Sequence, residues 1–101
     1  HALDLIRKGK NAEAVEMLIK DIQIKPDNPL LYIQLGEAYR QMQRESDAVL
    51  AFRKAIALDP LSKNGYEALA LFYKEKGEKQ KAVSTIVEYL KYKKEHKPLF
   101  E

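Results

Sequence analysis

Two histidines are the side chains best suited to proton transfer at neutral pH, and they lie near opposite ends of this 101-residue sequence. His96 stands in a lysine-rich stretch, far from His1. A Ser–His–Asp arrangement needs a His held between its partners, and a metal site needs three or four converging ligands. The Asp and Glu residues do not group with either His on one helix face, so we expect no catalytic or metal site there.

The glycines and the absence of cysteine restrict the chemistry further. Gly9, Gly36, Gly65 and Gly77 are isolated from one another, so no glycine-rich loop is present to bind a phosphate. Without Cys, neither a disulfide framework nor a Cys-based metal site can form. The sequence therefore predicts neither an enzyme nor a bound cofactor.

The net charge of +3 comes from the C-terminal part of the chain. Residues 1–60 carry 9 basic and 9 acidic side chains, whereas residues 61–101 carry 9 basic and 6 acidic ones. A nucleic acid could be attracted by the run Lys91, Lys93, Lys94 and Lys97. Lysines near a helix C-terminus also complement the helix dipole while staying solvated, and Glu88 and Glu95 dilute the run. Nucleic acid is therefore a disfavoured partner.

The apolar runs are only a few residues long, whereas a membrane-spanning helix needs about 20 apolar residues. No secretory signal is present either. The sequence thus predicts no membrane span and favours a cytoplasmic location. Its length fits one domain with a modest core.

Residues 32–42 carry the first strong helical pattern. Tyr32, Leu35 and Tyr39 stand at positions i, i+3 and i+7, which lie on one face of a helix. Gly36 lies on the same face, where a side chain would hold a neighbouring helix away. We expect this face to be core.

A second helical pattern follows after the polar turn at residues 44–47. Ala48, Phe52 and Ala55 form its apolar face. Pro60 cannot continue the helix and therefore closes the unit. Residues 32–60 are thus predicted to form a helix, a turn and a second helix.

The same pattern recurs at a step of about 34 residues. One step back, Ala14, Leu18 and Pro26 stand for Ala48, Phe52 and Pro60. One step forward, the motif residues are Tyr66, Leu69, Ala70, Tyr73, Ala82 and Ile86.

This repeated pattern resembles the tetratricopeptide repeat family, with Tyr32 in place of the usual Trp. The resemblance covers nearly the whole chain. It implies an all-α fold, a right-handed superhelical stack of antiparallel helix hairpins with about two and a half repeats. The single domain 1–101 would contain a partial repeat one at 1–26, repeat two at 29–60, repeat three at 63–96 with an extended last helix, and a tail at 97–101 after Pro98.

In tetratricopeptide folds the first helices of the repeats line a concave groove that holds extended or helical peptides. The resemblance therefore implies a protein–protein interaction scaffold that binds a partner peptide or amphipathic helix. The corresponding groove positions are Leu3, Ile6, Arg7, Leu30, Ile33, Glu37, Arg40, Gln41, Asn64, Glu67, Leu71 and Lys74. The apolar members are expected to form a strip across all three repeats.

One branch of the family grips the C-terminal carboxylate of chaperones with Lys, Arg and Asn side chains. The matching positions here include Gln34, Asn64 and Ala68. The basic side chains that carboxylate recognition requires are absent, which argues against chaperone-tail binding. The alternative from another class is a structural or self-associating segment without a peptide ligand.

The two ends of the predicted stack carry separate expectations. The register places the start of the first helix before residue 1, which predicts an exposed apolar face at Val15, Leu18 and Ile22. That face would support a homo-oligomer, while the alternative is a monomer with frayed residues 1–10. At the other end, Tyr89 stands where repeat two has the small Ala55, so the last helix is expected to end the stack.

Overall fold

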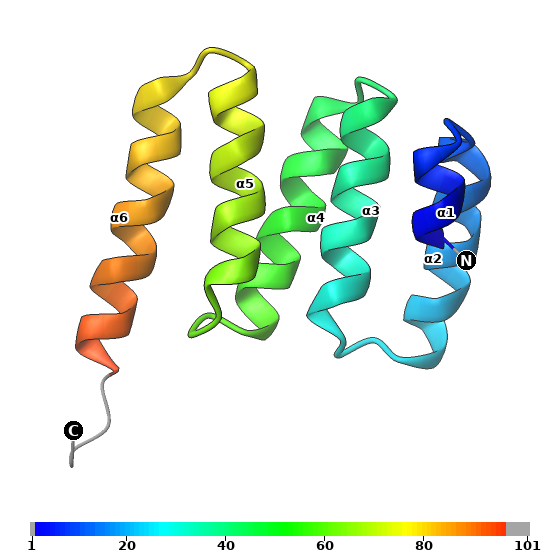
Figure 1. The fold of residues 1–101 in the computed structure, drawn as a ribbon. Coiled ribbons are helices and arrows are strands. Elements are labelled where there is room, and N and C mark those ends of the chain that lie inside the picture. The colour runs from blue at the N-terminus through cyan, green and yellow to red at the C-terminus, as the bar shows by residue number, and fades with distance from the viewer. Residues whose placement is uncertain (1, 97–101) are drawn as a thin grey trace.

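The computed structural model describes residues 2–96, and these residues form six α-helices and no strand. The helices are α1 (Ala2–Arg7), α2 (Asn11–Ile24), α3 (Pro29–Gln41), α4 (Glu45–Leu58), α5 (Lys63–Glu75) and α6 (Lys79–Glu95). They pair into hairpin one (α1 and α2), hairpin two (α3 and α4) and hairpin three (α5 and α6), and the hairpins stack side by side (Figure 1). The predicted all-α hairpin stack is confirmed. His1, Lys97, Pro98 and the expected tail at 97–101 lie outside the described residues.

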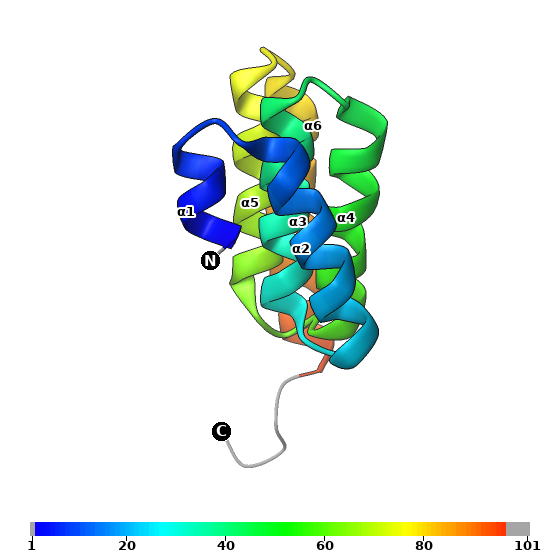
Figure 2. The ribbon, with the colours of Figure 1, turned by 90° about the vertical axis from the view of Figure 1, so that its right-hand side faces the viewer.

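The helices follow a regular order of contacts. The second helices α2 and α4 each pack against the first helix of their own hairpin and against the first helix of the next one, which is α3 for α2 and α5 for α4. The first helices α1, α3 and α5 also contact one another in succession. The view along the stack shows α1 and α5 on one side and α4 on the other (Figure 2). Among the helices described, α6 packs mainly against α5, and an ion pair between Arg53 and Glu88 at 2.7 Å also joins it to α4.

The turn inside each hairpin has one conformation that recurs every 34 residues. Gly9, Gln43 and Gly77 have φ angles of 78°, 62° and 79°, in the left-handed region that glycine adopts without strain. In the second turn the Arg44 N–H donates to the Tyr39 carbonyl at 2.9 Å. The other two turns make the corresponding bond, so all three helix ends are closed by the Schellman motif.

Side-chain caps begin the first helices of repeats two and three. The Asn28 Oδ1 accepts a hydrogen bond from the Leu30 N–H at 3.0 Å, and Pro29 occupies the first turn. The Ser62 Oγ accepts from the Asn64 N–H at 3.3 Å. Such caps satisfy backbone donors that have no partner inside the helix, so both helices start at defined residues.

The motif residues predicted from the repeat form the core. Those that are buried are Leu35, Gly36, Ala48, Phe52, Ala55, Tyr66, Leu69 and Ala70, and those that are half-buried are Tyr32, Tyr39, Pro60, Tyr73, Ala82 and Ile86. A Cβ atom added to Gly36 would lie 2.6 Å from Phe52 Cε1. The absence of a side chain at Gly36 therefore lets α3 and α4 approach each other closely.

The expectation of an exposed N-terminal face is wrong for Val15 and Leu18. Val15 is 9% exposed and Leu18 is fully buried, because the short α1 contributes Ala2 and Ile6 to the same core cluster. Ile22 is half-buried and packs against that cluster as well. Six helical residues are thus enough to cover Val15 and Leu18, which removes the reason for expecting self-association through this face.

Candidate protein-binding surface

A cleft of about 270 Å³ opens between the N-terminal halves of α3 and α5. Leu30 and Ile33 form its apolar wall, and Asn64 and Glu67 form part of its polar wall. Leu30 is 55% exposed, so its side chain is accessible to a partner. The structure thus brings four of the predicted groove residues together. We call this cleft the α3–α5 cleft.

The shape of the α3–α5 cleft depends on a second close helix approach. A Cβ atom added to Gly65 would lie 2.9 Å from Ile56 Cγ1. Gly65 therefore lets the start of α5 approach the end of α4, and this approach holds Asn64 and Glu67 opposite Leu30. Gly65 also lines the cleft, a role that the repeat pattern did not indicate.

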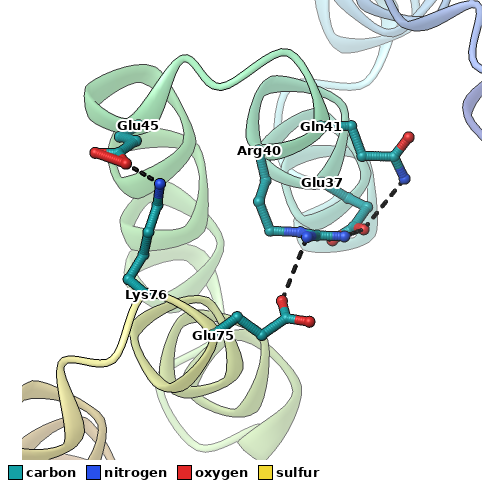
Figure 3. Close-up of polar contacts among 6 residues, drawn as sticks. All are labelled: Glu37, Arg40, Gln41, Glu45, Glu75 and Lys76. Carbon is teal, nitrogen blue, oxygen red and sulfur yellow. Dashed lines mark hydrogen bonds and ion pairs between the residues drawn. The ribbon is translucent and has the colours of Figure 1, made fainter.

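A network of paired charges lies toward the C-terminal ends of α3 and α5 (Figure 3). The Arg40 Nε donates a hydrogen bond to Glu37 Oε2 at 3.0 Å, and its guanidinium also forms ion pairs with Glu37 Oε1 and with Glu75, the latter at 3.3 Å. The hydrogen bond from Arg40 lowers the pKa of Glu37. The same bond raises the pKa of Arg40. Glu37 and Arg40 are thus paired with each other, and a ligand would have to displace this ion pair to bind either side chain.

Two predicted groove residues lie in a different cleft. Leu71 and Lys74 line a space of about 460 Å³ between α5 and α6, together with Val83 and Val87. Glu67 borders both this space and the α3–α5 cleft. Leu71 therefore does not share a cleft with Leu30 and Ile33.

The contribution of α1 to the groove is smaller than predicted. Ile6 is only 3% exposed and belongs to the core cluster, so a partner cannot reach its side chain in this structure. Leu3 is half-buried and Arg7 is exposed. The expected apolar strip across three repeats is thus interrupted, because Ile6 turns into the core and Leu71 lies in a separate cleft.

An exposed apolar stripe on α6 was not predicted from the sequence. Val83, Val87 and Leu90 are 62%, 53% and 55% exposed. The signal was available, since these residues follow the i, i+4, i+7 spacing of one helix face. Tyr89, in contrast, packs its ring inward on Tyr66, with ring centroids 5.0 Å apart. The size of Tyr89 therefore does not determine whether another helix fits beyond α6.

Two further observations concern residues 2–96. No helix in this range combines the length and the apolar character required to cross a lipid bilayer. Within the same range, no three His, Asp or Glu side chains are grouped so that they could hold a metal ion.

Residues 29–62 match the family model described as Tetratricopeptide repeat. The chain is also similar to Tetratricopeptide repeat protein 17. It is 33% identical to the protein from Mus musculus over 54 residues, which cover 54% of this chain and 4% of that protein. The Homo sapiens protein is 35% identical over 54 residues, covering 54% of this chain and 5% of that protein. The match thus spans a small fraction of these relatives.

Solved structures of MamA share the arrangement of helices. A structure of MamA residues 41 to the end from Desulfovibrio magneticus RS-1 has a TM-score of 0.78 at 18% identity, covering 96% of this chain and 55% of that one. A structure of MamA AMB-1 has a TM-score of 0.71 at 26% identity, covering 89% of this chain and 53% of the other. At such low identity the first likeness concerns the fold alone. The chain spans about half the length of these structures.

Proposed function

We propose that the α3–α5 cleft binds an extended peptide segment of a partner protein, because residues 29–62 match the tetratricopeptide repeat model and such repeats act as protein-interaction modules. The observation that carries the proposal is an accessible apolar wall at Leu30 and Ile33 facing polar side chains at Asn64 and Glu67. A concave apolar surface with a few polar groups is typical of a ligand site. The ligand would place an apolar side chain against Leu30 and Ile33.

The expected affinity is modest. Burying one apolar side chain fully contributes about 1.5–3 kcal/mol, and ordering the peptide consumes much of this gain. Two or three such anchors supply at most about 9 kcal/mol before that cost, so we expect binding no tighter than micromolar, which corresponds to about 8 kcal/mol. The paired charges of Arg40, Glu37 and Glu75 would affect the orientation of the peptide more than its affinity.

The experiment starts from a random peptide library selected against the chain. A selected peptide is titrated into labelled protein, and the amide chemical shifts locate its binding surface. Leu30→Glu should abolish binding, because it places a charge on the apolar wall. Leu50→Glu is the matched control, since Leu50 is also exposed but lies on α4.

Two results would contradict the proposal. Unchanged binding to the Leu30→Glu variant would show that the cleft is not the binding surface. A selection that yields no peptide dependent on residues of α3 and α5 would favour the alternative, a structural repeat segment without a peptide ligand.

A further inference from the structure

The three second helices present the same face, but the described part of the chain covers this face only on α2 and α4. Leu18 on α2, Phe52 on α4 and Ile86 on α6 occupy one position of the 34-residue repeat, and Ile56 and Leu90 share another. Leu18, Phe52 and Ile56 are buried beneath or beside the following first helix. Leu90 and the neighbouring Val83 and Val87 are more than half exposed. Among residues 2–96, no helix covers this face of α6 as α3 and α5 cover its two equivalents.

This open face continues onto α5. We define the end face as Leu71 of α5 and Val83, Ile86, Val87 and Leu90 of α6. The 460 Å³ space between the two helices forms its middle, and apolar side chains dominate its walls. Scattered exposed apolar residues are ordinary on a protein surface, whereas a contiguous patch indicates an interface.

The packing of α5 on α4 shows which residues a helix needs in order to pack on such a face. Gly65 lies against Ile56, where a Cβ atom would come within 2.9 Å. Tyr66, Leu69 and Phe72 then share a core cluster with Ile56. Because Leu90 is the repeat equivalent of Ile56, a helix on the end face needs a small residue opposite Leu90. Apolar residues must follow that small residue along the same side.

Two ion pairs that join hairpin two to α5 give the charge preference (Figure 3). Arg40 pairs with Glu75, and Glu45 pairs with Lys76. One repeat later, Arg40 is replaced by Lys74 and Glu45 by Lys79. Neither of these lysines forms an ion pair with another residue of the range 2–96.

A helix covering the end face would bring the last residues of its C-terminal turn to both lysines. The partner residue that matches Glu75 would face Lys74, as Glu75 faces Arg40. The next residue, which matches Lys76, would face Lys79. In hairpin two the basic Lys76 faces the acidic Glu45. Because the basic Lys79 takes the place of Glu45, the partner residue that faces Lys79 should be acidic as well.

We propose that the end face binds an amphipathic α-helix of a partner protein, with a small residue near its start and two consecutive acidic residues in its last turn. This surface is separate from the α3–α5 cleft, and the inference does not depend on the proposed function of that cleft.

The same charges argue against a second copy of this chain as the occupant. At the two positions that should be acidic, the first helices of this chain carry Arg7–Lys8, Gln41–Met42 and Glu75–Lys76. None of these pairs is doubly acidic. Two end faces packed on each other would bring the lysines of both copies into the same interface, where like charges repel.

Two synthetic peptides with blocked ends provide the test. The first has the sequence of residues 62–76 with Lys76→Glu, so that it ends in two acids. The second has residues 62–76 with Glu75→Lys and with Lys76 unchanged, so that it ends in two bases. Each is titrated into the labelled 101-residue chain, and the amide shifts report both affinity and location.

The acidic-ended peptide should bind more tightly by about two- to thirty-fold, which corresponds to two exposed ion pairs at the measured range for such pairs. The perturbed amides should lie in α5 and α6. The double substitution Lys74→Glu with Lys79→Glu should reverse the preference between the peptides. Val87→Lys should weaken both, while Leu30→Glu should change neither.

Several results would overturn the proposal. Equal affinity for the two peptides would refute the charge preference, and absence of binding would refute the surface. Concentration-dependent dimerisation that Val87→Lys abolishes would assign the end face to a second copy. A longer form of the polypeptide could also fail to bind the peptide and show protection of the α6 face. That result would mean that another segment of the same polypeptide covers the end face.

Discussion

Hairpins two and three have the same sequence pattern and the same turns, yet their second helices differ in burial. Phe52 is 1% exposed, because α3 lies on one side of its ring and Phe72 of α5 lies on the other, with ring centroids 6.2 Å apart. Ile86 occupies the same repeat position but is only half-buried. Burial at this position therefore comes partly from the next hairpin. Residues at the same repeat position therefore contribute differently to the free energy of unfolding in the middle and at the end of the stack.

This difference is expected for a fold in which each repeat contacts only its neighbours. The stability of such a stack is approximately a sum of repeat terms and interface terms. Hairpin two contributes to two interfaces, whereas hairpin three contributes to one among the described residues. Pairs of matched substitutions in the two hairpins can therefore separate the two kinds of term.

The largest difference is expected when the shared core position is emptied. Phe52→Ala should lower the free energy of unfolding by about 3–5 kcal/mol, because it opens a cavity between two interfaces. Ile86→Ala should cost less than about 2 kcal/mol, because one side of Ile86 is open. Urea unfolding measures both values. Equal losses would show that the end position is as constrained as the central one.

The next comparison concerns the pairing of residue sizes between the two helices of a hairpin. Hairpin two pairs Gly36 with Phe52, and the equivalent positions in hairpin three hold Ala70 and Ile86. Gly36→Ala should cost about 1–3 kcal/mol, because the new Cβ would overlap the Phe52 ring.

Transferring the hairpin-three pair tests whether this cost arises from the ring. In a Phe52→Ile background, Gly36→Ala should cost about 1 kcal/mol less than it does alone, a coupling within the range measured for residues in contact. Ala70→Gly in hairpin three serves as the control. Strict additivity of the two hairpin-two substitutions would contradict the pairing.

Most of the fold was predictable from the sequence because the repeat spacing fixes which residues share a face. The 34-residue step identified the buried Phe52, Tyr66 and Leu69. It also located the close approach at Gly36. These positions depend on contacts that every hairpin makes within itself or with an adjacent hairpin.

The groove was less predictable because its positions lie between successive first helices. Ile6, Arg40 and Lys74 share one repeat position, yet Ile6 is buried while Lys74 is exposed. The apolar character of Ile6 was the available signal that this side chain turns into the core. Leu71 lines the space beside α6 and not the cleft of Leu30. This placement depends on the distance between α5 and α6, which the repeat spacing does not give.

A smaller comparison uses the turns of the two hairpins. Gln43 has a φ of 62°, and Gly77 has a φ of 79° at the equivalent position. A side chain in this region is strained by about 1 kcal/mol or more. Gln43→Gly should therefore raise the unfolding free energy by about 0.5–1 kcal/mol, after the entropy cost of glycine.

The reverse change is its matched partner. Gly77→Gln should lower stability by about 1 kcal/mol, since no neighbouring atom blocks the site and only the backbone conformation is penalised. Thermal unfolding followed by circular dichroism measures both variants. Destabilisation by Gln43→Gly would mean that the Gln43 side chain makes a contribution larger than its backbone strain.

The smallest effect concerns the charges at Arg40 in hairpin two and Lys74 in hairpin three. The hydrogen bond from Arg40 lowers the pKa of Glu37 below its ordinary value of 4.5. A carboxylate whose pKa is lowered in the folded state stabilises the protein at every pH above its unfolded-state pKa. This stabilisation is lost as the pH falls from 4.5 through the folded pKa. Because both side chains are about one-third exposed, the contribution should stay below about 0.5 kcal/mol.

Arg40→Met should therefore raise the pKa of Glu37 toward 4.5 and flatten the loss of stability below that pH. Lys74→Met should leave the pKa of Glu37 unchanged, because Lys74 has no ion pair with another residue in the described range. Side-chain carboxyl shifts measured by NMR across the titration give the pKa directly. If Arg40→Met left the pKa of Glu37 depressed, the lowering would come from the surrounding field rather than from the Arg40 hydrogen bond, and the charge contrast between the two hairpins would have to be revised.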